Sequence, residues 1–303
     1  MNQNIYDKLK QILSSAQVKA DEPMKNHITF RVGGPADVYV LPKTKEELLQ
    51  VITCCKAENV PYYIIGNGSN LLVGDKGYRG VVIQIFKEMN EITCEGNVIC
   101  AQAGALLSQV AAKALEQSLT GFEFAAGIPG TLGGACVMNA GAYGGEMKDV
   151  LKEVTVLTDE GEFLTIPKEE LELGCRTSVI AKKGYIVIEA VLELKSGNAD
   201  EIRAYMNELK EKRITKQPLE YPSAGSTFKR PKGYFAGKLI MDAGLRGFQV
   251  GGVQVSEKHC GFVINTGDAT AEDVTELIRQ VAERVKAQSG VTLEPEVKLL
   301  GEF

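Results

Sequence analysis

The stretch Phe124–Gly145 limits what this chain can fold into more than any other feature. It carries no charged residue, seven glycines and one proline. It is long enough to raise the question of a membrane span, but a spanning helix needs continuous bulky apolar residues. Backbone wrapped closely around an extended ligand would account for both its apolar character and its glycines. We therefore predict a binding segment, with an irregular, tightly packed core segment as the alternative.

The rest of the composition agrees with a ligand-binding globular protein. Glycine makes up 32 of 303 residues, above the usual share of about 7%, and shows no collagen period. In the uncharged stretch, Thr131 and Asn139 are candidates to orient a ligand, and Ile128 and Val137 are candidates to cover its rings. The length predicts about two domains with ample material for a core.

Charge argues against a nucleic-acid or membrane partner. Lys and Arg number 34 against 39 Asp and Glu, which gives a net charge of −5. The chain therefore lacks the basic surface that nucleic acids or anionic lipids require. A polyanionic ligand would have to be held by a few well-placed cations.

Cysteine and histidine usage predicts neither disulfides nor a metal site. The seven cysteines are scattered without a C-x-x-C motif, as expected for free thiols in a reducing cytoplasm. Two histidines, His27 and His259, are too few for a His-rich metal site, and no G-x-S-x-G motif supports a serine triad. The N-terminus has no continuous apolar region typical of a targeting signal, so we expect a cytoplasmic protein.

Hydrophobic periodicity predicts an α+β chain in two lobes. Thr44 with Glu47 has the form of a capping box and should open a helix. Polar residues 195–200 form the best domain boundary. Further helices are expected at 105–119, 199–213 and across Val274–Val285, stopping at Gly290. Strands are expected at 60–65, 81–86, 98–103, 154–157, 163–166, 185–194, 252–255, 262–265 and 297–300.

A second glycine-rich segment, Ile64–Val73, directly follows a predicted strand. Its small residues could leave several backbone N–H groups free to converge on an anionic oxygen. It is not a Rossmann fingerprint, because Leu71 occupies the third glycine position and strand-like residues follow. Taken alone, Gly66-Asn67-Gly68 is more typical of a hairpin turn. The polar Ser69 and Asn70 favour phosphate binding.

Three polar segments are weaker candidates. Arg176 lies between strand-like runs and could pair with a carboxylate through its guanidinium. Ser226 follows Gly225 in a turn from which its hydroxyl could project. Glu296, beyond Pro295, leads into an apolar strand, where partial desolvation would suit its carboxyl to acid chemistry. For each of the three, a solvated surface position is the alternative.

Together these segments resemble one family, the UDP-N-acetylenolpyruvoylglucosamine reductases. The resemblance covers nearly the whole chain, from about residue 26 to residue 303. It rests on motifs that stand in the family's order: Asn26–Gly34, Gly66–Asn70, Gly127–Gly134, Arg176–Ser178, Ala224–Lys229 and Leu293–Val297. The short spacing from Arg176 to Ser226 resembles the family's compact second type, which lacks an inserted loop.

The resemblance implies an α+β fold with three parts. These are an N-terminal helix (residues 1–25), an FAD-binding lobe of the vanillyl-alcohol-oxidase (PCMH) type with two subdomains (26–197), and a C-terminal α+β substrate-binding domain (198–303). It also implies a monomeric cytoplasmic enzyme of peptidoglycan synthesis. In this family, NADPH reduces noncovalently bound FAD, and the flavin passes hydride to the enolpyruvyl ether of UDP-N-acetylglucosamine-enolpyruvate, giving UDP-N-acetylmuramate.

The resemblance also assigns roles to residues of this chain. Arg176 and Glu296 would stabilise the negative charge that hydride addition creates, and Ser226 would deliver a proton to C2. Arg213, Lys216 and Arg230 would bind the substrate, and no residue would bind a metal. The FAD-binding residues would be Gly66, Asn67, Gly68, Ser69, Asn70, Leu71, Gly127, Ile128, Pro129, Gly130, Thr131, Gly133, Gly134, Asn139 and Gly141.

The chain departs from the family at two positions, and two other functions stay open. Cys175 stands where the family often has Tyr, and Arg230 where many members have Asn. A flavin oxidase or dehydrogenase of the same fold, acting on an alcohol or hydroxy acid, is one alternative. A nucleotide-sugar binding module without redox chemistry is the other. The Ala224–Lys229 and Leu293–Val297 segments favour the reductase.

Overall fold

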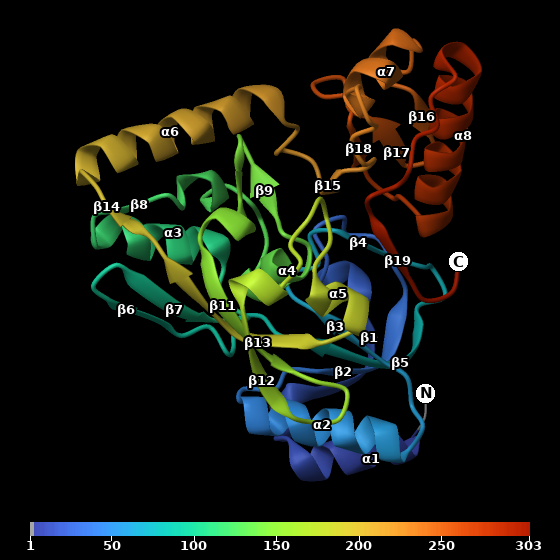
Figure 1. The fold of residues 1–303 in the computed structure, drawn as a ribbon. Coiled ribbons are helices and arrows are strands. Elements are labelled where there is room, and N and C mark those ends of the chain that lie inside the picture. Colours follow the sequence, from blue (N-terminus) through green and yellow to red (C-terminus); the bar gives the residue numbers. More distant parts are fainter. Residues whose placement is uncertain (1–2) are drawn as a thin grey trace.

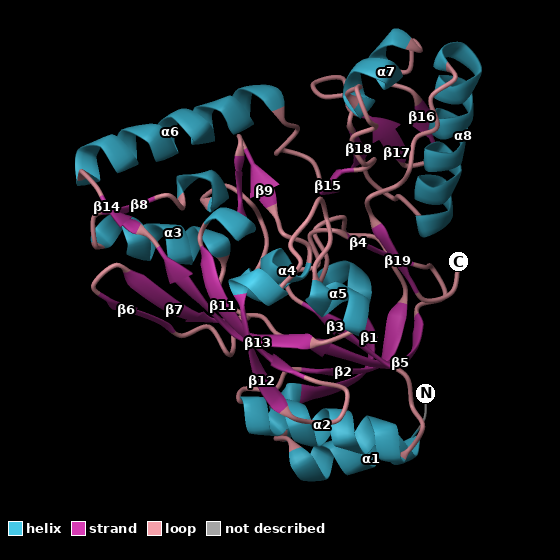
Figure 2. Cartoon of the chain, in the orientation of Figure 1, coloured by secondary structure: helices cyan, strands magenta, loops and turns pink. Residues whose placement is uncertain are grey.

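The computed structural model describes residues 3–303, which fold into a large first lobe and a smaller C-terminal lobe (Figure 1). Helices and strands are interspersed along the whole chain, as expected for an α+β protein (Figure 2). In the part of the chain that the structure describes, no helix is both long and apolar enough to cross a membrane.

The first lobe begins with a four-stranded sheet in the order β1-β2-β5-β3. Strand β1 is antiparallel to β2, and β5 lies parallel to both β2 and β3. The sheet is buried on both faces, because alternate residues of one strand enter two different cores: Val38 packs in one and Tyr39 in the other. The strands are β1 (Val18–Pro23), β2 (Pro35–Val40), β3 (Tyr62–Ile65) and β5 (Tyr78–Gln84).

Two helices, α1 (Gln3–Ile12) and α2 (Lys45–Ala57), contact each other and pack into the first of these cores. The Thr44 hydroxyl caps α2 by accepting from the Glu47 N–H, whereas the Glu47 carboxylate accepts from Lys43 and Gln17 and does not complete a capping box. The expected N-terminal helix over residues 1–25 is much shorter. Residues 1–2 lie outside the described residues, and residues 18–23 form β1, whose pairing with β2 satisfies its backbone.

A five-stranded antiparallel sheet completes the first lobe, in the order β12-β11-β13-β7-β6. Its strands are β6 (Ile92–Glu95), β7 (Val98–Gln102), β11 (Leu151–Leu157), β12 (Phe163–Pro167) and β13 (Ile186–Glu193). Helices α3 (Leu107–Glu116), α4 (Leu132–Val137) and α5 (Val179–Lys183) pack near it. Helix α4 and strand β9 (Gly141–Ala142) lie inside the uncharged stretch, and β10 (Gly145–Glu146), which pairs with β9, begins at its last residue, so the stretch is more regular than a loop.

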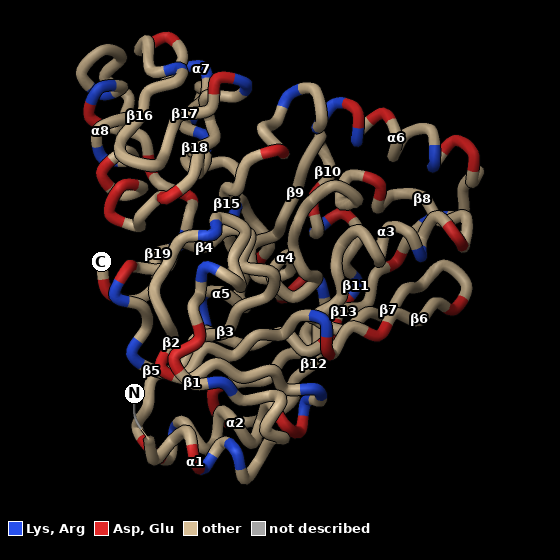
Figure 3. Tube along the Cα trace, turned by 180° about the vertical axis from the view of Figure 1, so that it is seen from behind, with Lys and Arg blue, Asp and Glu red and all other residues tan. Residues whose placement is uncertain are grey.

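Helix α6 (Ala199–Lys216) crosses the first lobe and carries charges of both signs along its length (Figure 3). It contacts α3, β8 (Leu119–Thr120) and the short 3₁₀ helix Glu123–Ala125. The two-stranded pair of β8 with β14 (Lys195–Ser196) lies just before it. We propose that the C-terminal domain begins after Lys216 and not at residue 198, because α6 packs on the first lobe.

The C-terminal lobe holds a four-stranded antiparallel sheet covered by two helices. The elements are β15 (Ser223–Ser226), α7 (Ala236–Asp242), β16 (Gln249–Val250), β17 (Val253–Val255), β18 (Phe262–Asn265) and α8 (Ala271–Ser289). Gly290, in the left-handed conformation, ends α8 as its position predicts. The last strand, β19 (Lys298–Leu300), leaves this lobe and pairs in parallel with β4 (Leu71–Val73) of the first lobe.

Candidate active site

A cavity of about 480 Å³ lies where the two lobes meet. The first lobe contributes residues from the two glycine-rich segments, and the C-terminal lobe contributes the chain from Gln217 to Ser226. Arg176, Ser226 and Glu296, which are far apart in the sequence, all line this cavity. The structure therefore brings together the three residues to which the resemblance gives catalytic roles.

Arg176 is presented by a tight turn. Gly174 and Thr177 exchange backbone hydrogen bonds of 3.1 and 3.3 Å, and Arg176 between them has a φ of +55°. Ser178 ends the turn: its buried hydroxyl donates to the Val137 carbonyl at 2.6 Å and also caps α5. The turn is thus fixed to the uncharged stretch, and the guanidinium Nε of Arg176 lies 2.6 Å from the Glu296 carboxylate.

Glu296 is held from both sides by backbone. Its N–H donates to the Thr227 carbonyl at 2.8 Å, and its own carbonyl accepts from the Asn70 side chain at 3.3 Å. The Asn70 carbonyl in turn accepts from the N–H of Lys298. Only 13% of the Glu296 side chain is exposed, which leaves the carboxylate at the cavity wall against Arg176.

Ser226 is the last residue of β15 and pairs with Phe262 of β18, after an irregularity in the register between Ser223 and Ser226. Gly225 has a φ of +75° with open space around it, so the turn itself requires glycine there. Thr227 anchors the far side, because its buried hydroxyl accepts from the Val263 N–H at 3.0 Å. The Ser226 residue is exposed to the cavity, and among residues 3–303 its hydroxyl has no hydrogen-bond partner.

The two glycine-rich segments touch each other beside the cavity. The Asn67 side chain donates to the Pro129 carbonyl at 2.7 Å. A Cβ on Gly66 would lie 2.2 Å from the Thr131 hydroxyl oxygen, so only glycine permits this approach. Gln84 supports the contact by donating to the Gly66 carbonyl at 2.8 Å.

Gln84 and Tyr39 are supporting residues that the sequence analysis missed. The Tyr39 hydroxyl donates to the Gln84 amide oxygen, and its ring stacks on His27 at 4.1 Å. Burial raises the pKa of the Tyr39 hydroxyl, which keeps it a donor. No motif signals this chain of contacts, because its members come from two strands of one sheet and a loop.

The proposed FAD residues divide into two groups. Ser69, Asn70, Ile128, Pro129 and Gly141 line the cavity. Others support the structure of the segments and do not line the cavity: the Thr131 hydroxyl caps α4, and Leu71 is buried in β4. The Asn139 amide is used within the protein, since it donates to Glu146 and the Gly174 carbonyl, and its oxygen accepts from the Lys148 N–H.

This arrangement fits FAD. Gly66 leaves no room for a Cβ against Thr131, and Gly133 leaves none against Ala103, so the backbone of each segment packs closely on its neighbour. Polar and apolar side chains line the cavity next to them. Backbone N–H groups and small polar side chains suit a diphosphate, and Ile128 and Pro129 suit the face of a ring.

The cations predicted to bind the substrate lie in different places. Arg213 lines the cavity, and burial lowers the pKa of its guanidinium. Lys216 is exposed at the end of α6 and does not line it. Arg230 stacks on the Phe235 ring at 4.0 Å and donates to the Tyr234 carbonyl, also away from the cavity lining. The exposed Arg31, which the sequence analysis did not single out, does line the cavity.

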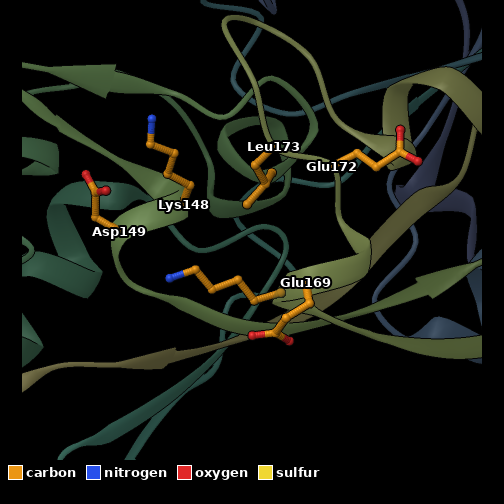
Figure 4. A pocket seen from close by; sticks show the side chains of 6 residues that line it. Lys148, Asp149, Glu169, Glu172 and Leu173 are labelled. Atoms are coloured by element: carbon orange, nitrogen blue, oxygen red, sulfur yellow. The ribbon is translucent and has the colours of Figure 1, made fainter.

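A second cavity of about 390 Å³ lies at the edge of the first lobe (Figure 4). Its lining includes Lys148, Asp149, Lys168, Glu169, Glu172 and Leu173. Side chains of both charges line it, and Lys148 and Glu172 already form ion pairs with Glu146 and Lys182. It contains none of the predicted site residues.

Comparison with known families accounts for both lobes. Residues 36–167 match the model of an FAD binding domain. Residues 217–300 match the model of the C-terminal domain of UDP-N-acetylenolpyruvoylglucosamine reductase. A protein of Clostridioides difficile (strain 630) with that reductase name is 56% identical over 301 residues, covering 99% of each chain. The chain belongs to this reductase family. It is an enzyme, an oxidoreductase that uses FAD.

Other relatives agree on the family. A reductase of the same name from Lachnoclostridium phytofermentans is 58% identical over 308 residues, covering 100% of this chain and 99% of its own. The crystal structure of the reductase from Thermus caldophilus is 38% identical, with a TM-score of 0.80 over 94% of this chain and 98% of that one. The expected family is therefore confirmed.

A more distant neighbour confirms the expected fold. An alkyldihydroxyacetonephosphate synthase structure is 19% identical and has a TM-score of 0.52 over 65% of this chain and 41% of that one. This likeness concerns the fold alone. It agrees with an FAD-binding lobe of the vanillyl-alcohol-oxidase type, joined here to the reductase family's own C-terminal domain.

Proposed function

We propose that this enzyme reduces the enolpyruvyl ether of UDP-N-acetylglucosamine-enolpyruvate to UDP-N-acetylmuramate, with NADPH as the source of reducing equivalents. The product is a precursor of peptidoglycan. The observation that carries the proposal is the meeting of Arg176, Ser226 and Glu296 at one cavity between the FAD-binding lobe and the reductase family's C-terminal domain. The relatives, which are named as reductases of this kind, support the reaction class.

FAD would be held by the two glycine-rich segments, Gly66–Leu71 and Gly127–Gly141. When bound, it supplies the hydride that is added to C3 of the enolpyruvyl group. Neither histidine and no cysteine lies in a recognisable attachment motif, so we expect noncovalent binding. Acid denaturation of the purified protein should release the yellow colour into the supernatant, and colour that stays with the precipitate would contradict this.

Arg176 and Glu296 would stabilise the charge that develops on the substrate. Hydride addition at C3 leaves negative charge at C2, delocalised into the adjacent carboxylate. A fixed guanidinium at that position favours the developing dianion over the ground state. In the structure Arg176 is paired with Glu296. A substrate carboxylate that approaches Arg176 would therefore compete with Glu296, and a protonated Glu296 could then donate a hydrogen bond.

Ser226 would deliver the proton to C2. A serine hydroxyl is a weak acid, but the enolate carbon is a strong base, so transfer is reasonable once the two are held in place. The fixed turn at Gly225 and the anchored Thr227 on either side provide that positioning. The unpaired hydroxyl at the cavity wall leaves the proton available.

Arg213 would bind the substrate's diphosphate, because it is the predicted substrate cation that lines the cavity. Lys216 and Arg230 would contribute only if their side chains reorient from the positions described. We further propose that the enzyme is a monomer, because residues of a single chain supply every group assigned a role. We propose a cytoplasmic location because all seven cysteines are free thiols.

The test separates the two half-reactions. Ser226→Ala should retain reduction of the flavin by NADPH but lose turnover of the enolpyruvyl nucleotide sugar, measured by anaerobic stopped-flow absorbance. Ser196→Ala, an exposed serine of β14, is the matched control. If both half-reactions fell equally in Ser226→Ala, Ser226 would not be the proton donor.

The same measurements distinguish the alternatives. Reoxidation of the reduced wild-type enzyme by the enolpyruvyl nucleotide sugar, without oxygen, supports the reductase. Reduction of the flavin by an alcohol or hydroxy acid would instead support an oxidase or dehydrogenase. Protein that neither contains nor takes up flavin would support a binding module.

A further inference from the structure

Gln217 lies at the junction of the two lobes. It ends α6 with an extended backbone conformation, because the following Pro218 disfavours a helical residue before it. Its N–H still donates to the Arg213 carbonyl at 2.8 Å, so the two residues are held one helical turn apart. Both residues belong to the lining of the cavity described above.

The side-chain amide of Gln217 has a buried oxygen that lacks a hydrogen-bond donor in the described part of the chain. Its amide oxygen is buried and has no hydrogen-bond partner among residues 3–303. Exchanging the oxygen and nitrogen of the amide would leave a buried donor unpaired instead. Buried polar groups in folded proteins are nearly always paired, because leaving one unpaired is destabilising. A group retained in this state at a cavity wall points to a ligand atom as its missing partner.

Arg213, like Gln217, has a polar group without a partner in the described part of the chain, and this group is charged. Its guanidinium makes no hydrogen bond or ion pair within the described part of the chain, although the side chain is half-buried. Its methylene stem packs on Gly127, where an added Cβ would lie 2.5 Å from Arg213 Cδ. A partly desolvated cation without a counter-charge favours an anionic ligand.

We propose that Gln217 is a ligand-binding residue: its amide oxygen accepts a hydrogen bond from a hydroxyl group that lies next to the phosphate held by Arg213. Hydroxyls close to a phosphate occur on the sugars of a nucleotide sugar and also on the ribose and ribityl chain of FAD. Since Gln217 leads directly into the Pro218–Ser226 segment of the C-terminal lobe, the nucleotide sugar is the ligand that the position favours. This inference rests on the proposed function for the identity of that ligand.

The test replaces the amide with an apolar group of similar size. Gln217→Leu should raise the KM for the enolpyruvyl nucleotide sugar about tenfold, as loss of one buried hydrogen bond implies, and leave kcat and FAD content unchanged. In the absence of substrate, the melting temperature should stay the same or rise, because the variant removes an unpaired buried atom. A merely structural glutamine would give the opposite, a lower melting temperature with unchanged KM.

Controls make each outcome decisive. Gln280→Leu removes a partnered glutamine on α8, where Gln280 donates to Glu276 at 2.8 Å, and should leave KM unchanged. Gln217→Met, which also lacks the amide, serves if the leucine variant does not fold. A weaker affinity for FAD with an unchanged KM would place the hydroxyl on the flavin. Unchanged affinity for both ligands would overturn the inference, and wild-type turnover measured in parallel shows whether the proposed function itself holds.

Discussion

Replacing Gly66 with alanine tests the contact between the two glycine-rich segments directly. The new Cβ would lie 2.2 Å from the Thr131 hydroxyl oxygen and 3.3 Å from both carbons of its side chain. Thr131 is only 2% exposed and its hydroxyl caps α4, so it cannot rotate away freely. The strain must therefore be taken up by moving one segment relative to the other.

The expected magnitudes follow from this geometry. Overpacking of this kind costs about 1–3 kcal/mol, and so close a contact places Gly66→Ala near the upper end. Thr131→Ala alone loses a helix cap, which costs about 1 kcal/mol. Independent effects would add to about 3–4 kcal/mol in the double variant. Because removing the hydroxyl also removes the closest overlap, we expect the double variant to lose only about 1–2 kcal/mol.

Urea unfolding of the flavin-free protein, followed by circular dichroism, measures these values without stabilisation by bound cofactor. Gly134→Ala is the matched control, because its Cβ would lie at an ordinary 3.6 Å from the same Thr131 oxygen. Strict additivity in the double variant, or a Gly66→Ala loss no larger than that of Gly134→Ala, would refute the argument that these segments are in contact.

Two further outcomes are expected. Glu296→Ala, which removes the donor, should lower turnover about 10²–10³-fold with flavin content unchanged, measured by steady-state kinetics, and near-normal turnover would contradict its role. The second outcome is the pH dependence of stability that His259 contributes. Burial lowers the pKa of His259 below its usual 6.5, and its Nδ1 accepts a hydrogen bond from the Gly261 N–H, so the ring is neutral in the folded protein. The unfolded chain therefore binds more protons below about pH 6.5, and stability should fall as the pH drops through this window. The urea midpoint of His259→Gln should fall less between pH 7.5 and 5.5, and a parallel fall in both proteins would show that His259 is not responsible.

Much of the secondary structure could be predicted from the sequence, because hydrophobic periodicity and helix-capping residues are local signals. The helix ending at Gly290 is an example: its apolar stripe, Val274–Val285, is buried, and the glycine terminates it. The predictions were wrong or incomplete where pairing between distant segments decides the conformation. Residues 18–23 carry no strong strand pattern and become β1 by pairing with β2. Likewise, α6 shows no strongly apolar face, so its packing on the first lobe could not be read from its sequence.

For the candidate site, the sequence indicated which residues carry chemistry but not how they are supported. Arg176, Ser226 and Glu296 were found through motifs, and the cavity that unites them depends on the arrangement of the two lobes. Asn139 shows the limit of this approach. Its position within a glycine-rich motif suggested a ligand contact, whereas its side chain is occupied by protein partners. Arg31 lies within the Asn26–Gly34 motif, but nothing in the sequence gave it or Gln217 a role, because only the folded cavity shows what surrounds them.

The parallel pairing of β19 with β4 has a consequence for biosynthesis. Residues 298–300 are synthesised more than 200 residues after residues 71–73, yet they complete a two-stranded sheet with them, directly after the loop expected to hold FAD. The N-terminal half of a nascent chain therefore cannot finish this part of its structure during translation. Stable uptake of the flavin should consequently follow synthesis of β19, and a variant that lacks β19 should retain the cofactor poorly at a loop more than 200 residues away in sequence.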